Sequence, residues 1–202
     1  MTENNTHTYD ASDIQVLEGL EPVRLRPGMY IGGTDEKAWH HLPIEIMDNS
    51  IDEAVAGFAK KITVNLIDAK TIEITDDGRG IPVDEHPKYP GKSALEVILT
   101  TLHSGGKFNN NVYKTSGGLH GVGSAVVNAL SSEMIVTISR DGYEWQQTFS
   151  RGKVTSPITR GDATRAHGTK IRFTIDDQIF GANAVFKPVK IYRMARAKSF
   201  LS

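Results

Sequence analysis

The amino-acid sequence predicts an α+β fold, a two-layer sandwich in which helices cover a mixed, mostly antiparallel sheet. Segments with strand-like alternation are joined by short turns and do not alternate strictly with helical segments, as a doubly wound parallel sheet would require. The 202 residues are 39% hydrophobic and 23% charged, which provides enough apolar material for one full core. We therefore expect one principal domain.

The first quarter of the chain predicts two helices after a polar start. Apolar residues favour a short helix over 14–20, and the Pro27-Gly28 pair then breaks it. A longer helix is predicted from 40 to 56, with Gly57 as its C-terminal stop. Its apolar stripe consists of Ile44, Met47, Ile51 and Val55.

The following elements are predicted from alternation and capping. Strands 62–66 and 72–75 form an antiparallel hairpin, and the second strand leads directly into Asp76. Ser93 followed by Glu96 is a capping-box pattern that opens a helix. The later elements are a helix at 124–130, a hairpin of strands 134–140 and 143–150 around Asp141-Gly142, a strand at 169–175 and a closing helix at 184–200.

Composition excludes several classes of function. The chain has no cysteine, so disulfide frameworks, thiolate metal sites and cysteine nucleophiles are excluded. Its formal charge of −1 lacks the basic footprint of a dedicated nucleic-acid-binding domain. No apolar run approaches the roughly 20 residues of a membrane span, and the polar start does not resemble a secretory signal. We therefore expect a cytoplasmic protein with no membrane association.

A glycine-rich segment is the first candidate for ligand binding. Residues 103–123 contain six glycines and are longer than an ordinary connection. Neither G-x-x-x-x-G-K-[ST] nor a dinucleotide fingerprint is present, but Gly117 to Gly123 runs directly into a predicted helix. Glycines allow a phosphate to approach the backbone, and the helix N-terminus favours an anion. A flexible connector is the alternative interpretation.

The helix over 40–56 carries a polar stripe opposite its apolar one. Glu45, Asn49 and Glu53 recur at four-residue spacing, with Asp52 beside them. A solvated acidic face is the ordinary interpretation. However, an asparagine amide oxygen is a suitable Mg²⁺ ligand, and Glu45 could accept a proton from an attacking water. His41, four residues earlier, could hold the Glu45 carboxylate in place.

Asp76 is the third candidate, at the end of a predicted strand. The turn-forming pair Asp77-Gly78 is explained by the turn alone, but Asp76 is not. A carboxylate fixed at a strand end can accept a hydrogen bond from an exocyclic amino group, which suits recognition of adenine.

These three elements together resemble the ATPase superfamily of gyrase, the Hsp90 chaperones, histidine kinases and mismatch-repair MutL proteins. Within it, the sequence is most similar to the B-type subunits of bacterial type II DNA topoisomerases, topoisomerase IV and gyrase. The matching segments are Tyr9-Asp10, Arg26 to Gly32, Glu45-x-x-x-Asn49, Asp48 to Ala54, Asp76 to Pro82, His103 to Phe108 and Ser116 to Gly123. The resemblance implies a Bergerat-type ATP-binding fold over 13–202, preceded by a partly disordered arm over 1–12 and cut before a transducer domain.

The resemblance also implies a role for each matching residue. Glu45 corresponds to the general base, Asn49 to the Mg²⁺ ligand, and Asp76 to the residue that binds the adenine amino group. Thr169 shares the adenine network, Gly80 lines the pocket, and Arg79 pairs with Glu53 beside the base. Pro82 and Arg140 correspond to positions where aminocoumarin-type inhibitors lie. The positions implied to close over the nucleotide are Lys107, Tyr113, Lys114, Gly117, Gly118, Leu119, His120, Gly121, Val122 and Gly123, and Tyr9 corresponds to an arm that reaches a partner subunit's nucleotide.

The implied function is ATP binding and hydrolysis with Mg²⁺, which closes a clamp on DNA for strand passage. The implied partners are DNA through the intact complex, a second copy of the chain, and a DNA-cleaving A-type subunit. Two alternatives remain open. One is a nucleotide-gated dimerisation module without turnover of its own, and the other is a different ATPase of the superfamily, such as a MutL-like protein. A pure binding module would need Asn49 and Asp76 but no base at Glu45.

Overall fold

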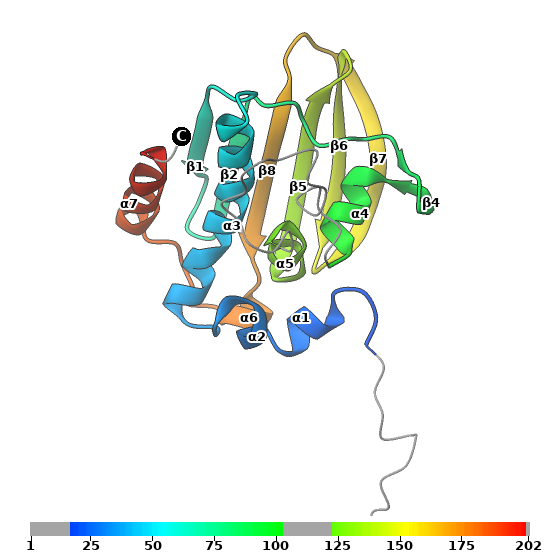
Figure 1. Cartoon of the computed structure of the whole chain (residues 1–202). Helices are drawn as coiled ribbons and strands as arrows, with labels where there is room; N and C mark the ends of the chain where they lie inside the picture. Colours follow the sequence, from blue (N-terminus) through cyan, green and yellow to red (C-terminus); the bar gives the residue numbers. More distant parts are fainter. Residues whose placement is uncertain (1–16, 103–122, 201–202) are drawn as a thin grey trace, which may run out of the picture.

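The computed structural model describes residues 17–102 and 123–200, and it confirms the predicted α+β sandwich. One six-stranded sheet forms one layer, and helices cover one of its faces (Figure 1). All five strand pairings in this sheet are antiparallel. The strand order is β1(Ile62–Leu66), β2(Thr71–Asp76), β8(Gly168–Ile175), β5(Ser131–Arg140), β6(Tyr143–Ser150) and β7(Lys153–Ala163).

The first described segment departs from the predicted helix over 14–20. Residues 17–20 form an irregular segment and a turn, and α1(Glu21–Leu25) begins only after them. Gly19 takes a φ of +57°, which is incompatible with a continuing right-handed helix, and a proline in the first turn of α1 favours a start there. The first helix ends just before Pro27, as predicted. Pro27 is then the N-cap of a further single helical turn, α2(Gly28–Ile31).

The long helix α3(Glu36–Val55) begins four residues earlier than predicted, because the Asp35 side chain caps it by accepting from the Ala38 N–H. Gly57 follows the helix with a φ of +82°, as expected of a C-terminal stop. The predicted apolar stripe was wrong except at Met47. Val55 is 51% exposed, whereas the face buried in the core carries Leu42 and Ile46 beside Met47.

The first predicted hairpin is confirmed, and a second small one was missed. Strands β1 and β2 pair antiparallel with Val64 opposite Ile74. After β2 the chain forms β3(Glu85–His86) and β4(Tyr89–Ser93), which pair only with each other. Ser93 then caps α4(Ala94–Thr100) by accepting from the Glu96 N–H at 3.1 Å, as the capping pattern predicted.

The second half of the sheet is a meander of three strands. Helix α5(Gly123–Ala129) leads into β5, and Asp141 and Gly142, both with positive φ, turn the chain into β6 as predicted. Arg151 and Gly152 repeat this turn and start β7, which the sequence analysis missed. Strand β7 lies at the sheet edge and accommodates Pro157, which weakens its strand pattern.

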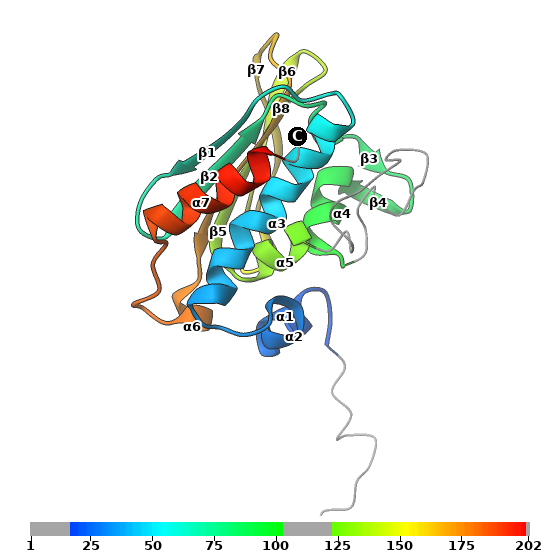
Figure 2. The same ribbon diagram turned by 60° about the vertical axis from the view of Figure 1, so that its left-hand side comes forward.

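The C-terminal part completes the helical layer. Strand β8 is inserted between β2 and β5, as Figure 1 shows, and a short helix α6(Asp177–Phe180) follows it. The closing helix α7(Pro188–Ser199) is shorter than predicted, because residues 184–187 are not helical and Lys187 is its N-cap. Figure 2 shows α7, α3, α5 and α4 as one layer over the sheet.

The two faces of the sheet differ in chemistry. Alternate side chains of the central strands are buried under the helices, including Ile74, Ile171 and Phe173. Their neighbours in sequence, such as Thr75 and Lys170, point to the other face because side chains alternate along a strand. The core therefore lies between the sheet and the helices, and the opposite face is polar.

Candidate functional site

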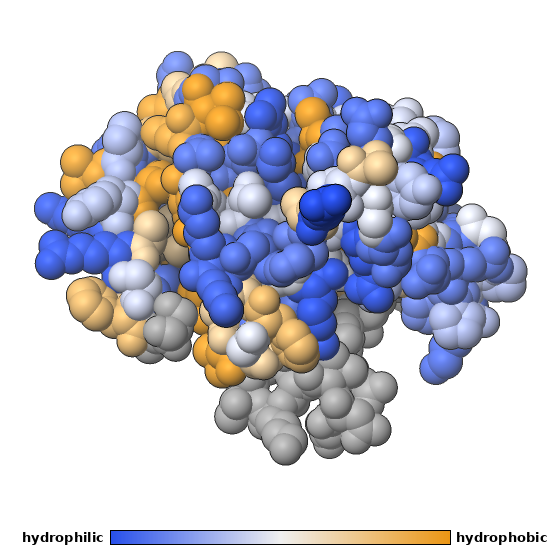
Figure 3. All heavy atoms as spheres, turned by 90° about the horizontal axis from the view of Figure 1, so that it is seen from above, coloured by the Kyte–Doolittle hydropathy of each residue, from blue (hydrophilic) through white to orange (hydrophobic). Residues whose placement is uncertain are grey.

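The residues predicted to bind nucleotide gather between the helices and one end of the sheet. They come from the second half of α3, the end of β2 with its following turn, the start of β8 and the start of α5. Figure 3 looks onto this end of the molecule from above, where hydrophilic residues occupy most of the middle and hydrophobic ones lie toward the margins.

Asp76 is held rigidly at the end of β2. It is 7% exposed, and one carboxylate oxygen accepts from the Ser50 hydroxyl at 2.7 Å. The other oxygen accepts from the Gly78 N–H at 2.9 Å. Burial raises the pKa of Asp76, and the bonds from Ser50 and Gly78 oppose that rise. The result is a desolvated acceptor that is oriented before any ligand arrives.

The turn after Asp76 requires glycine at close approaches. A Cβ on Gly78 would lie 2.9 Å from carboxylate oxygens of both Asp76 and Glu53. Gly80 has a φ of +76°, and its Cβ would lie 3.1 Å from the Ser139 carbonyl oxygen. Thr169 accepts from the Ile81 N–H at 3.2 Å and so ties this turn to β8. Pro82 follows on the surface.

Glu53 and Arg79 form the ion pair that the resemblance implied. The Arg79 guanidinium donates to both oxygens of Glu53, at 2.7 and 3.1 Å, and the Arg79 backbone N–H adds a third bond at 3.0 Å. The guanidinium carbon lies 3.8 Å from the centre of the Phe58 ring. On the other side of the turn, Arg140 donates to the Gly80 carbonyl oxygen at 2.9 Å.

Glu45 and His41 lie one helical turn apart on α3, nearer its N-terminus. The His41 Nε2 and Glu45 Oε1 atoms are 2.7 Å apart, and this bond raises the pKa of His41. The carboxylate of Glu45 fills the space beside Gly123, because a Cβ on Gly123 would lie 2.2 Å from Glu45 Oε2. A carboxylate and the first residue of α5 therefore meet here.

Asn49 lies between these two groups on the same helix. Its amide nitrogen donates to the Ser124 hydroxyl at 2.7 Å, which ties α3 to α5. With the nitrogen engaged in this way, the amide oxygen is the atom that can serve a cation. Asp52, which the sequence analysis placed beside Asn49 and Glu53, is instead buried in the interior, at 3% exposed.

The structure therefore brings together two groups of predicted residues. One contains Asp76, Glu53, Arg79, Gly80, Arg140 and Thr169, and the other contains His41, Glu45, Asn49 and Gly123. They are joined through Ser50, which the sequence analysis missed together with Ser124. Ser50 could have been found because it is a polar residue on the buried face of a helix, where a hydroxyl needs a hydrogen-bond partner. The predicted residues Tyr9, Lys107, Tyr113, Lys114, Gly117, Gly118, Leu119, His120, Gly121 and Val122 lie outside the described residues.

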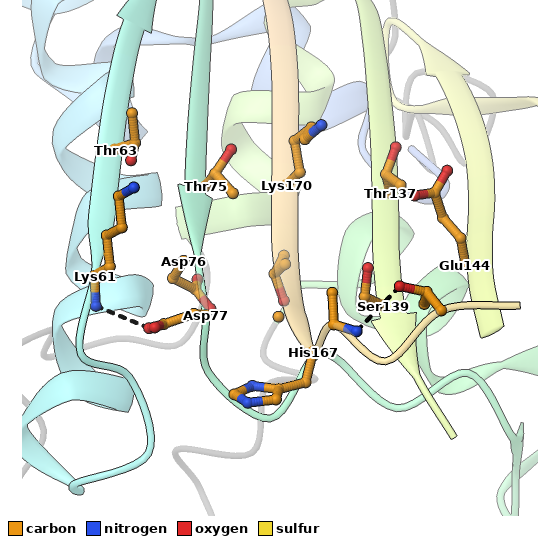
Figure 4. Close-up of a pocket in the computed structure, with 14 residues that line it drawn as sticks. Lys61, Thr63, Thr75, Asp76, Asp77, Thr137, Ser139, Glu144, His167 and Lys170 are labelled. Carbon is orange, nitrogen blue, oxygen red and sulfur yellow. Dashed lines mark hydrogen bonds between the residues drawn. The ribbon is translucent and has the colours of Figure 1, made fainter. Parts of the chain in front are cut away.

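A cavity lies elsewhere, on the polar face of the sheet (Figure 4). It has a volume of about 350 Å³, and Asp76 and Thr169 are among its lining residues. Asn49, Glu45 and Glu53 are not among its lining residues. The other residues predicted to bind nucleotide converge instead on the helical face of the sheet.

The described residues contain neither a membrane-spanning helix nor a cluster of metal-binding side chains. No helix within 17–102 and 123–200 is long and apolar enough to cross a membrane. No group of three or more His, Asp or Glu residues in the same ranges could hold a metal ion.

Comparisons with known proteins agree with this geometry. A family model described as histidine kinase-, DNA gyrase B- and HSP90-like ATPase matches residues 34–179. The B subunit of DNA topoisomerase 4 from Caulobacter vibrioides is 63% identical over 193 residues, which cover 96% of this chain and 28% of that protein. The B subunit of DNA gyrase from Thermotoga maritima is 50% identical over 193 residues, covering 96% of this chain and 30% of that protein.

A solved structure gives the same result. The 43K ATPase domain of Thermus thermophilus gyrase B, crystallised in complex with an aminocoumarin, matches with a TM-score of 0.78 and 43% identity. The match covers 90% of this chain and 45% of that one. The chain spans about 30% of the length of the curated relatives it matches.

Proposed function

Because the chain belongs to the histidine kinase-, DNA gyrase B- and HSP90-like ATPase family, we propose that it is the ATP-binding domain of a B-type subunit of a bacterial type II DNA topoisomerase. The observation that carries the proposal is the buried Asp76 carboxylate, fixed by Ser50 and Gly78 next to the helix that carries Asn49 and Glu45. The 63% identity to the B subunit of a topoisomerase 4 supports the assignment to this class of proteins.

The adenine base binds at Asp76. One of its carboxylate oxygens accepts from Ser50 and the other from Gly78, and a carboxylate has enough lone pairs to accept from the exocyclic amino group of adenine as well. Glu53 and Arg79 flank the base, and Gly80 permits its close approach. Pro82 and Arg140, at the outer side of this turn, are where an aminocoumarin-type inhibitor would lie.

The phosphates extend toward Asn49 and Glu45. Mg²⁺ fits at Asn49, because the bond to Ser124 directs the amide oxygen to a cation that also takes phosphate oxygens and water. When bound, the ion would neutralise phosphate charge and so favour attack on the γ-phosphate. The start of α5 at Gly123 lies beside Glu45, so an anion near this helix end would also meet the general base.

Hydrolysis uses Glu45 as the general base. The carboxylate takes a proton from a water molecule as the water oxygen attacks the γ-phosphorus, and ADP leaves with the bridging oxygen. His41 is a positioning residue, because its bond of 2.7 Å fixes the orientation of the carboxylate.

In the intact complex, we propose that this reaction closes a clamp around DNA. The partners would be a second copy of the subunit, a DNA-cleaving A-type subunit and the DNA itself. The second candidate function, a nucleotide-gated dimerisation module, is disfavoured by the oriented Glu45 and His41 pair, for which a pure binding module has no use.

The adenine assignment is tested with the Asp76→Asn variant. An amide keeps the shape of the side chain but places a donor where the amino group of adenine also donates. We expect ATP affinity to fall at least tenfold, consistent with loss of a hydrogen bond to a charged group. Calorimetry with ATP and with inorganic triphosphate separates the outcomes: triphosphate affinity should stay within twofold of the parent, and unchanged ATP affinity would refute the adenine assignment.

A further inference from the structure

The polar face of the sheet carries a hollow that shares Asp76 and Thr169 with the proposed nucleotide site but includes none of Glu45, Asn49 and Glu53. Figure 4 shows its lining residues, which come from β1, β2, β8, β5 and β6 and from the loop before β8. Its volume of about 350 Å³ lies in the range of sites for small molecules, roughly 300 to 1,000 Å³.

Strand register explains why the hollow exists. One row of side chains on this face runs Thr63, Thr75, Lys170 and Thr137, from β1 to β5. In the next row, Gly168 stands beside Ser139 and supplies no side chain. A Cβ there would lie 1.9 Å from the Asp76 carbonyl oxygen, so glycine is required. The backbone of Gly168, rather than a side chain, therefore lines the hollow at this point.

Two lysines line the hollow without a carboxylate partner. Neither Lys61 nor Lys170 forms an ion pair in the described part of the chain, and both side chains are exposed. By contrast, Arg172, the next residue of β8 on this face, is paired with Glu73 at 2.7 Å. Two free ammonium groups around hydroxyl-lined walls are suited to an anion with several acceptor oxygens.

Two acidic residues, Asp77 and Glu144, also line the hollow, and they lie at different distances from the two lysines (Figure 4). Asp77 accepts from the backbone N–H groups of Lys61 and Lys60, at 2.8 and 2.7 Å, and these bonds lower its pKa. The Asp77 carboxylate therefore remains charged, and the backbone N–H groups of Lys60 and Lys61 compensate part of that charge. Glu144, opposite Ser139 in the register, lies at the β6 side, away from β1 and Lys61. The hollow thus has a cationic side and an acidic side.

His167 forms part of the rim. Its Nδ1 atom lies 2.8 Å from the Gly78 carbonyl oxygen, which can only accept, so Nδ1 carries the proton. This bond links the hollow to the turn that holds Asp76, and both Asp76 and Thr169 line the hollow.

We propose that this hollow binds a small ligand that carries a phosphate monoester at one end and an amino group at the other, separately from ATP. Lys61 and Lys170 bind the phosphate, and one of its terminal oxygens also accepts from Thr75, on the strand between β1 and β8. Glu144 binds the amino group. A simple carboxylate ligand fits less well, because it brings one negative charge and two oxygens to two ammonium groups and a hydroxyl.

The test uses phosphoethanolamine as the probe, with ethyl phosphate as the matched ligand that lacks the amino group. Each is titrated into the isotope-labelled chain and followed by amide chemical shifts. We expect both to shift Thr75, Ser139 and Lys170, with phosphoethanolamine bound at least fivefold more tightly. Shifts confined to Asn49 and Gly123 would place the phosphate in the nucleotide site and overturn the proposal.

Variants separate the two ends of the ligand. Lys170→Gln should weaken both probes at least tenfold, while Lys153→Gln, which removes an exposed lysine on edge strand β7, should leave both unchanged. Glu144→Gln should abolish only the preference for phosphoethanolamine. All three positions are exposed, so the fold should tolerate the changes. Equal affinity of the parent and Lys170→Gln for both probes would refute the site.

Discussion

The two ends of the proposed ATP site are built in different ways. At the adenine end, Asp76, Gly80 and Thr169 are fixed by backbone pairing between strands and by a turn with close glycine contacts. At the phosphate end, Glu45 and Asn49 project from a helix and are oriented by side-chain bonds, which include those to His41 and Ser124.

This difference predicts different responses to substitution. Many hydrogen bonds between β2 and β8 together fix the position of the adenine end. A substitution there should therefore lower both ATP affinity and the free energy of unfolding. A side-chain pair on a helix can be altered while the backbone stays in place, so a change at the phosphate end should affect turnover more than stability. Each prediction below tests one side of this comparison.

The largest effect is expected for Glu45→Gln in the intact subunit. The amide cannot take a proton from water, so ATP hydrolysis should fall by about 10²- to 10⁴-fold, while ATP affinity stays within a few-fold. Steady-state hydrolysis with DNA present and equilibrium ATP binding measure the two quantities. Hydrolysis near the parental rate would favour the nucleotide-gated module instead.

A large effect on stability is expected for Gly168→Ala at the adenine end. Gly168 has a φ of +133°, and the new Cβ would lie 1.9 Å from the Asp76 carbonyl oxygen. We expect a loss of about 3 kcal/mol or more in the free energy of unfolding, with ATP affinity reduced as well. Urea denaturation gives the first quantity and calorimetry the second.

Gly142→Ala is the matched control for this prediction. Gly142 also has a positive φ, +83°, but a Cβ there meets no atom within 4 Å. Only the conformational cost remains, about 1 to 2 kcal/mol. If both variants lose the same free energy of unfolding, the close contact between Gly168 and Asp76 does not contribute to stability at the adenine end.

The sequence predicted a set of site residues that the structure brings close together, although several element boundaries were wrong. Asp76 was singled out because the turn does not explain it, and Glu45 and Asn49 because they recur at four-residue spacing on one helix. The face of α3 that packs on the core was predicted incorrectly. Val55 fits the helical spacing of apolar residues, but it lies at the end of the helix and is exposed to solvent.

Two other features could not be predicted for physical reasons. Strand β7 is an edge strand, so its outer face is solvated and it lacks the alternation that reveals a half-buried strand. The hollow around Gly168 depends on which residues of five strands share a row, and register between distant strands is not contained in any local pattern.

A smaller effect is expected for His41→Gln at the phosphate end. Its bond to Glu45 raises the pKa of His41 above the ordinary value of 6.5, so the imidazolium persists to higher pH in the folded protein. The variant should lower kcat about tenfold with KM for ATP nearly unchanged, in keeping with the usual range for a group that acts through another. It should also lose the change in kcat with pH above 6.5. A change in KM alone would point to a binding role for His41.

The smallest effect concerns His40, the neighbour of His41 on α3, and it tests whether the helical layer is sensitive to pH. Its Nδ1 atom lies 2.8 Å from the Glu36 carbonyl oxygen, and its Nε2 atom accepts from the Lys187 N–H at 2.9 Å, at the start of α7. Burial lowers the pKa of His40, with Lys190 and Lys187 acting in the same direction and Glu36 against it.

A histidine whose pKa is lower in the folded state binds more protons when unfolded, at pH values between the two pKa values. Its stabilising contribution is therefore present above pH 6.5 and is lost as pH falls through that window, because a proton on Nε2 would displace the Lys187 N–H and weaken the attachment of α7. Urea denaturation at pH 7.5 and 5.5 should show a larger loss of stability for the parent than for His40→Gln. Adenine binding at Asp76 should persist in both, because the strands that hold it do not depend on α7. An equal loss in parent and variant would remove His40 as the cause, and a parallel loss of ATP affinity would show that the sheet end and the helical layer are not independent.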